Sequence, residues 1–185
     1  MTITGQLVTI RSNFSLAIFC HCLIRRMKPE DITAANRVVI GEGGLYCIPR
    51  GKEVPAGAGS FYDVGFAGSP NFNLNRAAME FAKMALRNFT LDSYEALFNY
   101  CKQTNQLSRM QVQPWYEFAR MVRNSLTHTQ HWRFRRGDLV RLPVSWRGKT
   151  IEATMDGQEL TADFYDWWDG CELWSEMYAF AETLS

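Results

Sequence analysis

The sequence has no apolar run as long as a membrane-spanning helix requires. Its most apolar stretch, from Phe14 to Ile24, contains His21 and is about half the roughly 20 residues needed. Arg25 and Arg26 follow this stretch, where a signal peptide would have small residues for cleavage. The sequence therefore predicts a cytoplasmic protein with no membrane partner.

Metal ligands are also scarce. The chain has only 3 histidines, and its 5 cysteines are an odd number without a regular spacing, which is typical of reduced thiols. Cys20 and Cys22 flank His21, but in a helix these two thiols point about 200° apart, and no second pair has the spacing of metal ligands. We therefore expect neither a metal nor a cofactor.

Hydrophobic periodicity predicts a mainly all-α protein. Apolar residues recur at helical spacing over residues 6–27, 74–89, 92–101, 114–126 and 162–184. Between about 139 and 161 the period falls to 2, and Arg147-Gly148 and Asp156-Gly157 are typical of tight turns, the second of a hairpin. The expected architecture is a bundle of about five helices with a β-hairpin before the last, in a single domain over 1–185. Trp167 and Trp168 are expected in its core, with a subunit interface as the alternative for one ring.

Residues 37–70 interrupt this pattern. The segment holds eight of the 13 glycines and three of the 6 prolines, which favours a long irregular loop. Gly51-Lys52 departs from a phosphate-binding loop, because Glu53 replaces the hydroxyl residue that would bind magnesium. A surface loop of unknown role is the simpler interpretation.

Charge is distributed unevenly, although the formal net charge is only +1. Residues 120–149 contain one acid, Asp138, and eight basic residues: Arg120, Arg123, Arg133, Arg135, Arg136, Arg141, Arg147 and Lys149. Residues 150–185 contain acids and no lysine or arginine. This asymmetry predicts either a basic surface that binds a polyanion or two regions that pair with each other.

The helix expected over 114–126 ends in a polar hexapeptide, Arg123-Asn124-Ser125-Leu126-Thr127-His128. Residues four apart lie on one helix face, so the Asn124 amide can orient the His128 ring. Arg123 does not share this face in a straight helix. A histidine that moves a proton and a guanidinium that stabilises a crowded phosphate are the groups required for cleavage of RNA by its own 2′-hydroxyl.

This hexapeptide resembles the signature of the HEPN superfamily, in which an arginine, followed directly by a polar residue, is separated from a histidine by four to six residues. Members of the family are small helical bundles, many of them dimeric, and include metal-independent endoribonucleases of toxin–antitoxin, abortive-infection and CRISPR-associated systems. The resemblance implies a catalytic role for Arg123 and His128, with Asn124 orienting them. It also implies a homodimer, a setting in bacterial defence, and an antitoxin or regulatory protein as a further partner. Gln130 stands where the nucleotidyltransferase-regulated branch has a tyrosine, so silencing by nucleotide transfer is not expected.

The basic residues beside the hexapeptide are candidates for binding RNA. They are Arg120, His131, Arg133, Arg135 and Arg136. Phe134, which stands between Arg133 and Arg135 in the sequence, could supply an aromatic platform. Two alternatives stay open: a bundle that binds nucleotide, RNA or a partner protein without catalysis, and a structural protein whose acidic C-terminal helix docks elsewhere. In the simplest alternative, His128 only caps a helix and residues 133–136 form a solvated turn.

Overall fold

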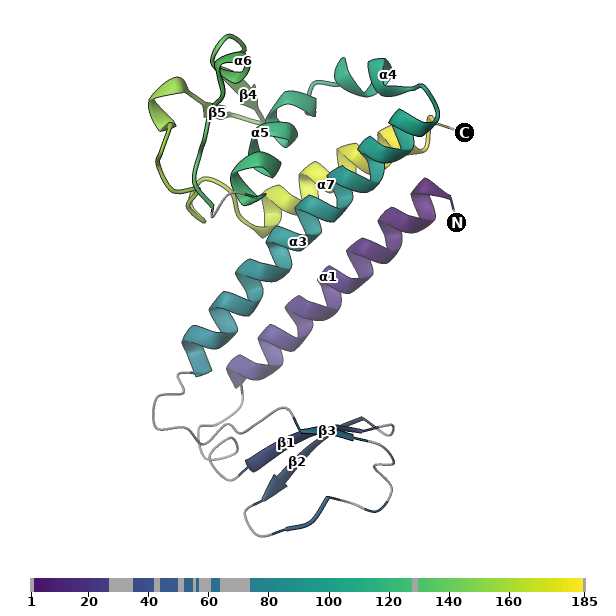
Figure 1. Ribbon diagram of the computed structural model, residues 1–185, viewed down its shortest axis with the longest axis vertical. Coiled ribbons are helices and arrows are strands. Elements are labelled where there is room, and N and C mark those ends of the chain that lie inside the picture. Colours follow the sequence, from purple (N-terminus) through teal and green to yellow (C-terminus); the bar gives the residue numbers. More distant parts are fainter. Residues whose placement is uncertain are drawn as a thin grey trace. The chain divides into compact units, whose positions relative to one another are not determined.

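The computed structural model describes residues 2–26, 35–41, 44–49, 52–54, 56, 61–63, 74–127 and 130–184. Its contacts divide the chain into two units, one of Met1–Ala17 with Lys83–Ser185 and the other of Ile18–Ala82. The described residues are mainly helical, which confirms the predicted fold class (Figure 1). The α-helices are α1 (Ile3–Arg26), α3 (Leu74–Gln103), α4 (Leu107–Gln111), α5 (Tyr116–Thr127), α6 (Arg136–Leu139) and α7 (Trp167–Ala181).

Helix α3 is one continuous helix of 30 residues, where the sequence suggested two helices separated near Thr90. The polar residues at the expected break lie in the core. Thr90 is 3% exposed and forms a 2.9 Å hydrogen bond with the Tyr165 hydroxyl, and Ser93 is fully buried. Because hydroxyl residues are typical both of helix starts and of buried polar contacts, their local pattern does not distinguish the two.

The core of the first unit lies between α1, α3, α5 and α7. Phe14 of α1 stacks on Phe89 of α3 with ring centroids 4.3 Å apart, and the Trp174 indole of α7 donates a 3.2 Å hydrogen bond to the Leu7 carbonyl. Within this unit α1, α3 and α7 lie alongside one another (Figure 1). The fully buried side chains include Leu7, Leu97, Phe118, Val122 and Leu173.

The β-hairpin before α7 is present as predicted. Strands β4 (Val144–Trp146) and β5 (Lys149–Ile151) pair antiparallel. Arg147 and Gly148 join them with φ of 47° and 79°, and two positive values are typical of the type I′ turn that matches strand twist. Asp156-Gly157 forms a turn after the short 3₁₀ helix η2 (Ala153–Met155), and not a second hairpin, because the residues after it pair with 130–132.

The second unit contains strands where we expected an irregular loop over 37–70. Strands β1 (Ala35–Gly41), β2 (Gly44–Pro49) and β3 (Phe61–Asp63) form an antiparallel sheet in the order β2-β1-β3. The register of the first pair aligns Val38 with Cys47. A β-branched run, Val38 to Ile40, followed by a glycine-rich connection favours such a hairpin, and the high glycine content obscured this pattern.

Helix α7 begins with two tryptophans that are more exposed than predicted. Trp168 is 75% exposed and Trp167 is 39% exposed, so core packing is wrong for Trp168. The Asp166 carboxylate caps the helix by accepting hydrogen bonds from the Trp168 and Asp169 amides. This cap satisfies free amides of the first turn, and the buried residues of the helix begin at Gly170. No helix in the described part of the chain is long and apolar enough to cross a membrane.

Candidate RNA-binding site

Helix α5 separates its polar and apolar residues onto two faces. The buried face consists of Tyr116, Phe118, Ala119, Met121, Val122, Ser125 and Leu126. On the other face lie Arg120, Arg123 and Asn124, which are neighbours because residues three and four apart in a helix lie side by side. Burial of the apolar face thus presents these three polar side chains together.

Arg123 is held by an acidic residue of α3. Its Nε and one terminal nitrogen both donate to Oε1 of Glu95, the Nε bond being 2.6 Å long. The other terminal nitrogen donates a 3.0 Å hydrogen bond to Oδ1 of Asn124. A guanidinium has five N–H donors, and its contacts with the described residues use three, which leaves two that could donate to a ligand. Asn124 and Glu95 together therefore orient the Arg123 side chain.

The C-terminal end of α5 is fixed by Arg87, also from α3. The Arg87 Nε donates a 2.7 Å hydrogen bond to the Leu126 carbonyl, one of the carbonyls that a helix end leaves without a partner in the helix. A positive side chain here also complements the helix dipole. His128 directly follows the last helical residue in sequence, but it lies outside the described residues.

Arg120 connects α5 to the segment around α6. Its Nε lies 2.9 Å from Glu117 and a terminal nitrogen lies 2.7 Å from Oδ1 of Asp138. Burial alone favours the uncharged guanidinium, but the two carboxylates outweigh this and raise the pKa of Arg120. Burial likewise acts to raise the pKa of Asp138, but hydrogen bonds from the Arg135 amide and the Arg120 guanidinium prevail and lower it. Both groups are therefore charged at neutral pH.

Residues 131–134 form an extended segment after a turn at Gln130 and, together with Arg135 and Arg136, are here called the arginine segment. It is anchored to 156–160: the Trp132 amide donates to the Gln158 carbonyl at 2.8 Å, and the Phe134 amide donates to Oδ1 of Asp156 at 2.9 Å. The Trp132 side chain is 1% exposed and packs edge-on against Phe164. Because alternate residues of an extended chain point to opposite sides, the burial of Trp132 leaves Arg133 exposed.

These elements enclose a pocket of about 400 Å³, here called the arginine pocket. Helix α5 contributes its polar face, the arginine segment contributes two cations and an aromatic ring, and α6 contributes a carboxylate. The lining residues are Arg120, Arg123, Asn124, Arg133, Phe134, Arg135 and Asp138. Four arginines and one aromatic residue thus line the same hollow.

Ion pairs with carboxylates neutralise most of the basic residues of 120–149, here called the basic tract. The hairpin residues Arg147 and Lys149 pair with acids of α7, at 2.7 Å to Glu172 and 2.9 Å to Asp169. The basic and acidic regions therefore do pair with each other in part, as one of the two alternatives predicted. Arg141 pairs with Glu117. Among the described residues, no carboxylate forms an ion pair with the three arginines of the arginine segment, Arg133, Arg135 and Arg136.

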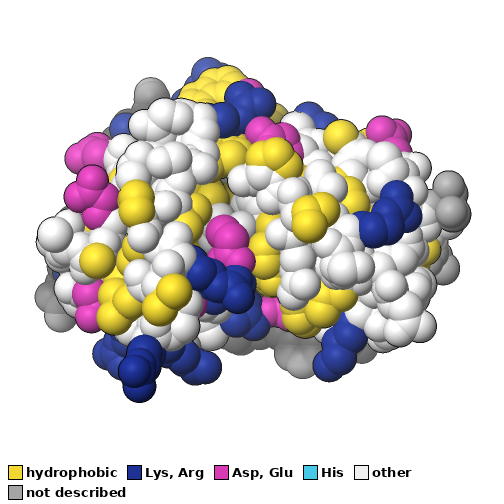
Figure 2. Space-filling view, turned by 90° about the horizontal axis from the view of Figure 1, so that it is seen from above, with side chains coloured by type: hydrophobic (Ala, Val, Ile, Leu, Met, Phe, Trp, Pro, Cys, Tyr) yellow, Lys and Arg dark blue, Asp and Glu magenta, His cyan; other side chains and the backbone are white. Residues whose placement is uncertain are grey.

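Figure 2 shows one face of the molecule, on which lysine and arginine side chains gather in groups among hydrophobic atoms. Acidic side chains lie beside several of these groups in the same view, in keeping with the ion pairs of the basic tract. Among the described basic residues of 120–149, those that form no ion pair with a carboxylate are the arginines of the arginine segment.

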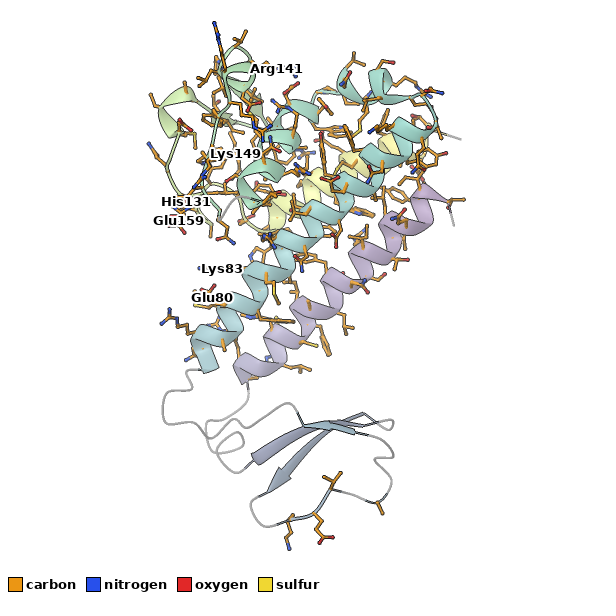
Figure 3. All side chains as sticks on the ribbon, in the orientation of Figure 1. Glu80, Lys83, His131, Arg141, Lys149 and Glu159 are labelled. Carbon is orange, nitrogen blue, oxygen red and sulfur yellow. The ribbon has the colours of Figure 1, made fainter. Side chains whose placement is uncertain are left out.

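The structure brings together six of the residues that we singled out from sequence: Arg120, Arg123, Asn124, Arg133, Phe134 and Arg135. Arg136 is exposed at the start of α6 and does not line the arginine pocket. His131 forms a β-bridge with Glu159, and the two residues are adjacent in Figure 3. His131 also lies outside the pocket lining. In the described part of the chain, no group of three or more His, Cys, Asp and Glu side chains is placed to hold a metal ion.

Three contributors to the site were missed from sequence. Glu95 and Arg87 belong to α3 and reach α5 only through the fold, so no local pattern marks them. Asp138 is the one acid within a basic tract, and this isolation is a signal that could have identified it as a structural partner of an arginine.

Comparison with known proteins adds no relative from which a role could be transferred. No family model matches the sequence, and neither a curated protein nor a solved structure is detectably similar to the chain. A function for this protein therefore has to be inferred from the chemistry of the site itself.

Proposed function

We propose that the protein is a metal-independent endoribonuclease of the HEPN type, which binds the RNA backbone in the arginine pocket. The observation that carries the proposal is that four arginines line one hollow, and that two of them form no ion pair with a carboxylate among the described residues. Arginines bind phosphate through paired N–H donors, and an aromatic ring among them suits an unstacked base. These features fit single-stranded RNA better than they fit a neutral ligand.

The proposed reaction needs one proton removed and one supplied. The RNA 2′-oxygen loses its proton and forms a bond to phosphorus, while the bond from phosphorus to the 5′-oxygen breaks and that oxygen gains a proton. The products are a 2′,3′-cyclic phosphate and a 5′-hydroxyl. His128 takes or gives one of these protons, and the two remaining donors of Arg123 stabilise the negative charge on the phosphate oxygens.

A second function, RNA binding without cleavage, is favoured by one contact. The Glu95 carboxylate already neutralises Arg123, and this reduces the positive charge available to a transition state. In that case the arginine pocket would still bind the RNA backbone through Arg133 and Arg135. The two functions differ in their dependence on Arg123 and His128. The ribonuclease needs both residues for cleavage, whereas the binding module binds RNA without requiring either.

The test is to incubate single-stranded and structured RNA with purified protein in EDTA, beside Arg123→Ala and His128→Ala. The ribonuclease proposal expects cleavage by the wild type to 2′,3′-cyclic phosphate ends, and a loss of at least about 100-fold in each variant, the range for one proton-transfer or charge-stabilising group. An inert wild type that still binds RNA would support the binding module.

A matched arginine keeps the comparison free of charge effects. Arg109 of α4 donates to Gln106 and Thr183 and does not line the arginine pocket. Arg109→Ala therefore removes the same charge at a position outside the site. Cleavage by Arg109→Ala at the wild-type rate, with circular dichroism unchanged in all variants, assigns the losses to the site. Equal loss in Arg109→Ala would contradict a specific role for Arg123.

A further inference from the structure

A second pocket of about 340 Å³ adjoins the arginine pocket, here called the aromatic pocket. The two pockets share Arg120, Arg123 and Asn124 in their linings. The polar face of α5 therefore borders both, and a ligand that extends past this face can occupy the two at once. The volume falls within the range of roughly 300–1,000 Å³ that is usual for small-molecule sites.

The far wall of this pocket is aromatic and apolar. Tyr94 and Phe98 of α3 stack with ring centroids 5.9 Å apart, and Tyr94 lies 6.2 Å from Tyr116 of α5. Tyr94 and Tyr116 are each 4% exposed, whereas Phe98 and Leu107 of α4 are only half-buried. The buried tyrosines thus support the accessible ring of Phe98, which can stack on a flat ligand.

The charge state of the wall is neutral. Burial raises the pKa of Tyr94 well above its ordinary value, and a hydrogen bond with Tyr116 acts in the same direction. The positive charges of Arg120 and Arg123 oppose this shift without overcoming it. The wall therefore attracts a ligand by stacking and exclusion of water and not by charge.

Two polar groups at the pocket are available to a ligand. Both contacts from Arg123 go to Oε1 of Glu95, and among the described residues no donor is bonded to Oε2. Gln111 of α4 is exposed, and its side-chain amide can both donate and accept. An acceptor and an amide at the rim of an aromatic pocket match a flat ring that carries an amino group on its edge.

We propose that the aromatic pocket is a purine subsite: it binds one nucleobase of the RNA strand whose phosphate lies in the arginine pocket. The inference rests on the proposed RNA-binding function and adds the part of the ligand that it recognises. A purine stacks on Phe98 over a larger area than a pyrimidine. The adenine amino group donates to the free oxygen of Glu95, while uracil presents carbonyl oxygens in place of an amino group.

Shared lining residues argue for a nucleotide over other occupants. A peptide side chain could fill the apolar wall, but it would not supply the anion that the adjoining cations require. A nucleotide supplies a flat ring and a phosphate in one molecule. The ring can enter the aromatic pocket while the phosphate lies in the arginine pocket on the other side of Arg123. The complementarity is of two different kinds, stacking in one pocket and charge in the other.

Binding can be separated from cleavage by using RNA that has no nucleophile. Short fluorescein-labelled 2′-O-methyl oligoadenylate and oligouridylate are titrated with protein, and the dissociation constants are measured by fluorescence anisotropy. The wild type is expected to bind oligoadenylate about tenfold more tightly than oligouridylate, the order of magnitude of one base–aromatic stack. Phe98→Leu keeps an apolar side chain and Gln111→Ala changes an exposed one, and each is expected to reduce this preference, Phe98→Leu to nearly none.

Two further variants distinguish the subsite from general effects. Trp168→Leu removes an exposed aromatic ring that lines neither pocket, and it is expected to leave the preference unchanged. Arg133→Ala is expected to weaken both oligonucleotides equally, because a phosphate contact does not read the base.

Each outcome separates the two proposals. Equal affinity of the wild type for both oligonucleotides, or a preference that survives in Phe98→Leu, overturns the purine subsite. If such base-independent binding still weakens in Arg133→Ala, the proposed RNA-binding function stands without the subsite. If neither oligonucleotide binds, both proposals fail.

Discussion

Arg123 and Glu95 lie on different helices and meet at one carboxylate oxygen, which accepts from two nitrogens of the same guanidinium. The side chains are 33% and 37% exposed, so the pair borders solvent and both pockets are within its reach. An arginine in the proposed site is thus positioned by an anion that also competes with the phosphate of a ligand. In the proposed RNA-binding function, the Glu95 carboxylate therefore has two opposing effects.

Glu95→Gln is expected to strengthen RNA binding about fivefold, because one unit of negative charge leaves the neighbourhood of a bound phosphate, an effect of about 1 kcal/mol near water. The free energy of unfolding should fall by only about 0–1 kcal/mol, since the pair is part-exposed. Anisotropy titrations with 2′-O-methyl oligouridylate, which has no amino group to donate to Glu95, and urea denaturation measure the two quantities. Glu182→Gln, which removes an exposed charge at the end of α7, is the control. Weaker RNA binding in Glu95→Gln would show that positioning of Arg123 outweighs the competing charge.

Arg133, Arg135 and Arg136 offer a comparison between near neighbours that carry the same charge and form no ion pair in the described part of the chain. Arg133 and Arg135 line the arginine pocket, whereas Arg136 does not. Replacing either of the first two with alanine should reduce the slope of log affinity against log salt concentration by about 0.7, the loss of one phosphate contact on single-stranded RNA. Arg136→Ala should leave the slope nearly unchanged. Equal slopes in the three variants would mean that the RNA follows the exposed surface and not the pocket.

Asp138→Asn tests the connection between α5 and the arginine segment. The folded-state pKa of Asp138 is lowered, so its carboxylate contributes stability that is present above the unfolded-state pKa, about 4, and is lost as the pH falls through the folded-state value. The variant should be less stable than the wild type at pH 7 by about 1–3 kcal/mol, because the half-buried Arg120 loses a charged partner. The difference should shrink as the pH falls below about 4. Urea denaturation at several pH values checks this, and a difference that is constant with pH would contradict it.

The two tryptophans Trp168 and Trp174 should differ sharply in their contribution to folding. Trp174 is 4% exposed, bonded to Leu7 and stacked on Tyr178, so Trp174→Ala should destabilise the protein by about 3–5 kcal/mol. Trp168→Ala removes a side chain that is 75% exposed and should change the free energy of unfolding by less than about 0.5 kcal/mol. Thermal denaturation of the two variants in parallel is sufficient. A large loss in Trp168→Ala would reveal that its ring is covered, for instance by a second subunit.

Local patterns predicted those parts of the fold that local forces determine. The amphipathic period predicted α5 and its polar face, and Arg147-Gly148 predicted the hairpin turn, since a type I′ turn needs two residues with positive φ. Thr90 and Ser93 favoured a break that α3 does not have, because their hydroxyls are buried by the approach of distant residues such as Tyr165. The same limit applies to the site: the sequence places Arg123 beside Asn124, but only tertiary packing brings Glu95 to Arg123.

The continuity of α3 has a consequence for how the sequence can change. Three residues of the site come from this one helix. Arg87 binds the end of α5, Glu95 forms the ion pair with Arg123, and Phe98 lines the aromatic pocket. Each residue inserted into or deleted from a helix rotates everything beyond it by about 100° and moves it by about 1.5 Å. A single such change between Arg87 and Phe98 would therefore separate these three contacts, whereas the turn at 104–106 can vary in length without affecting their spacing. The number of residues between these positions is as much a part of the site as the side chains themselves.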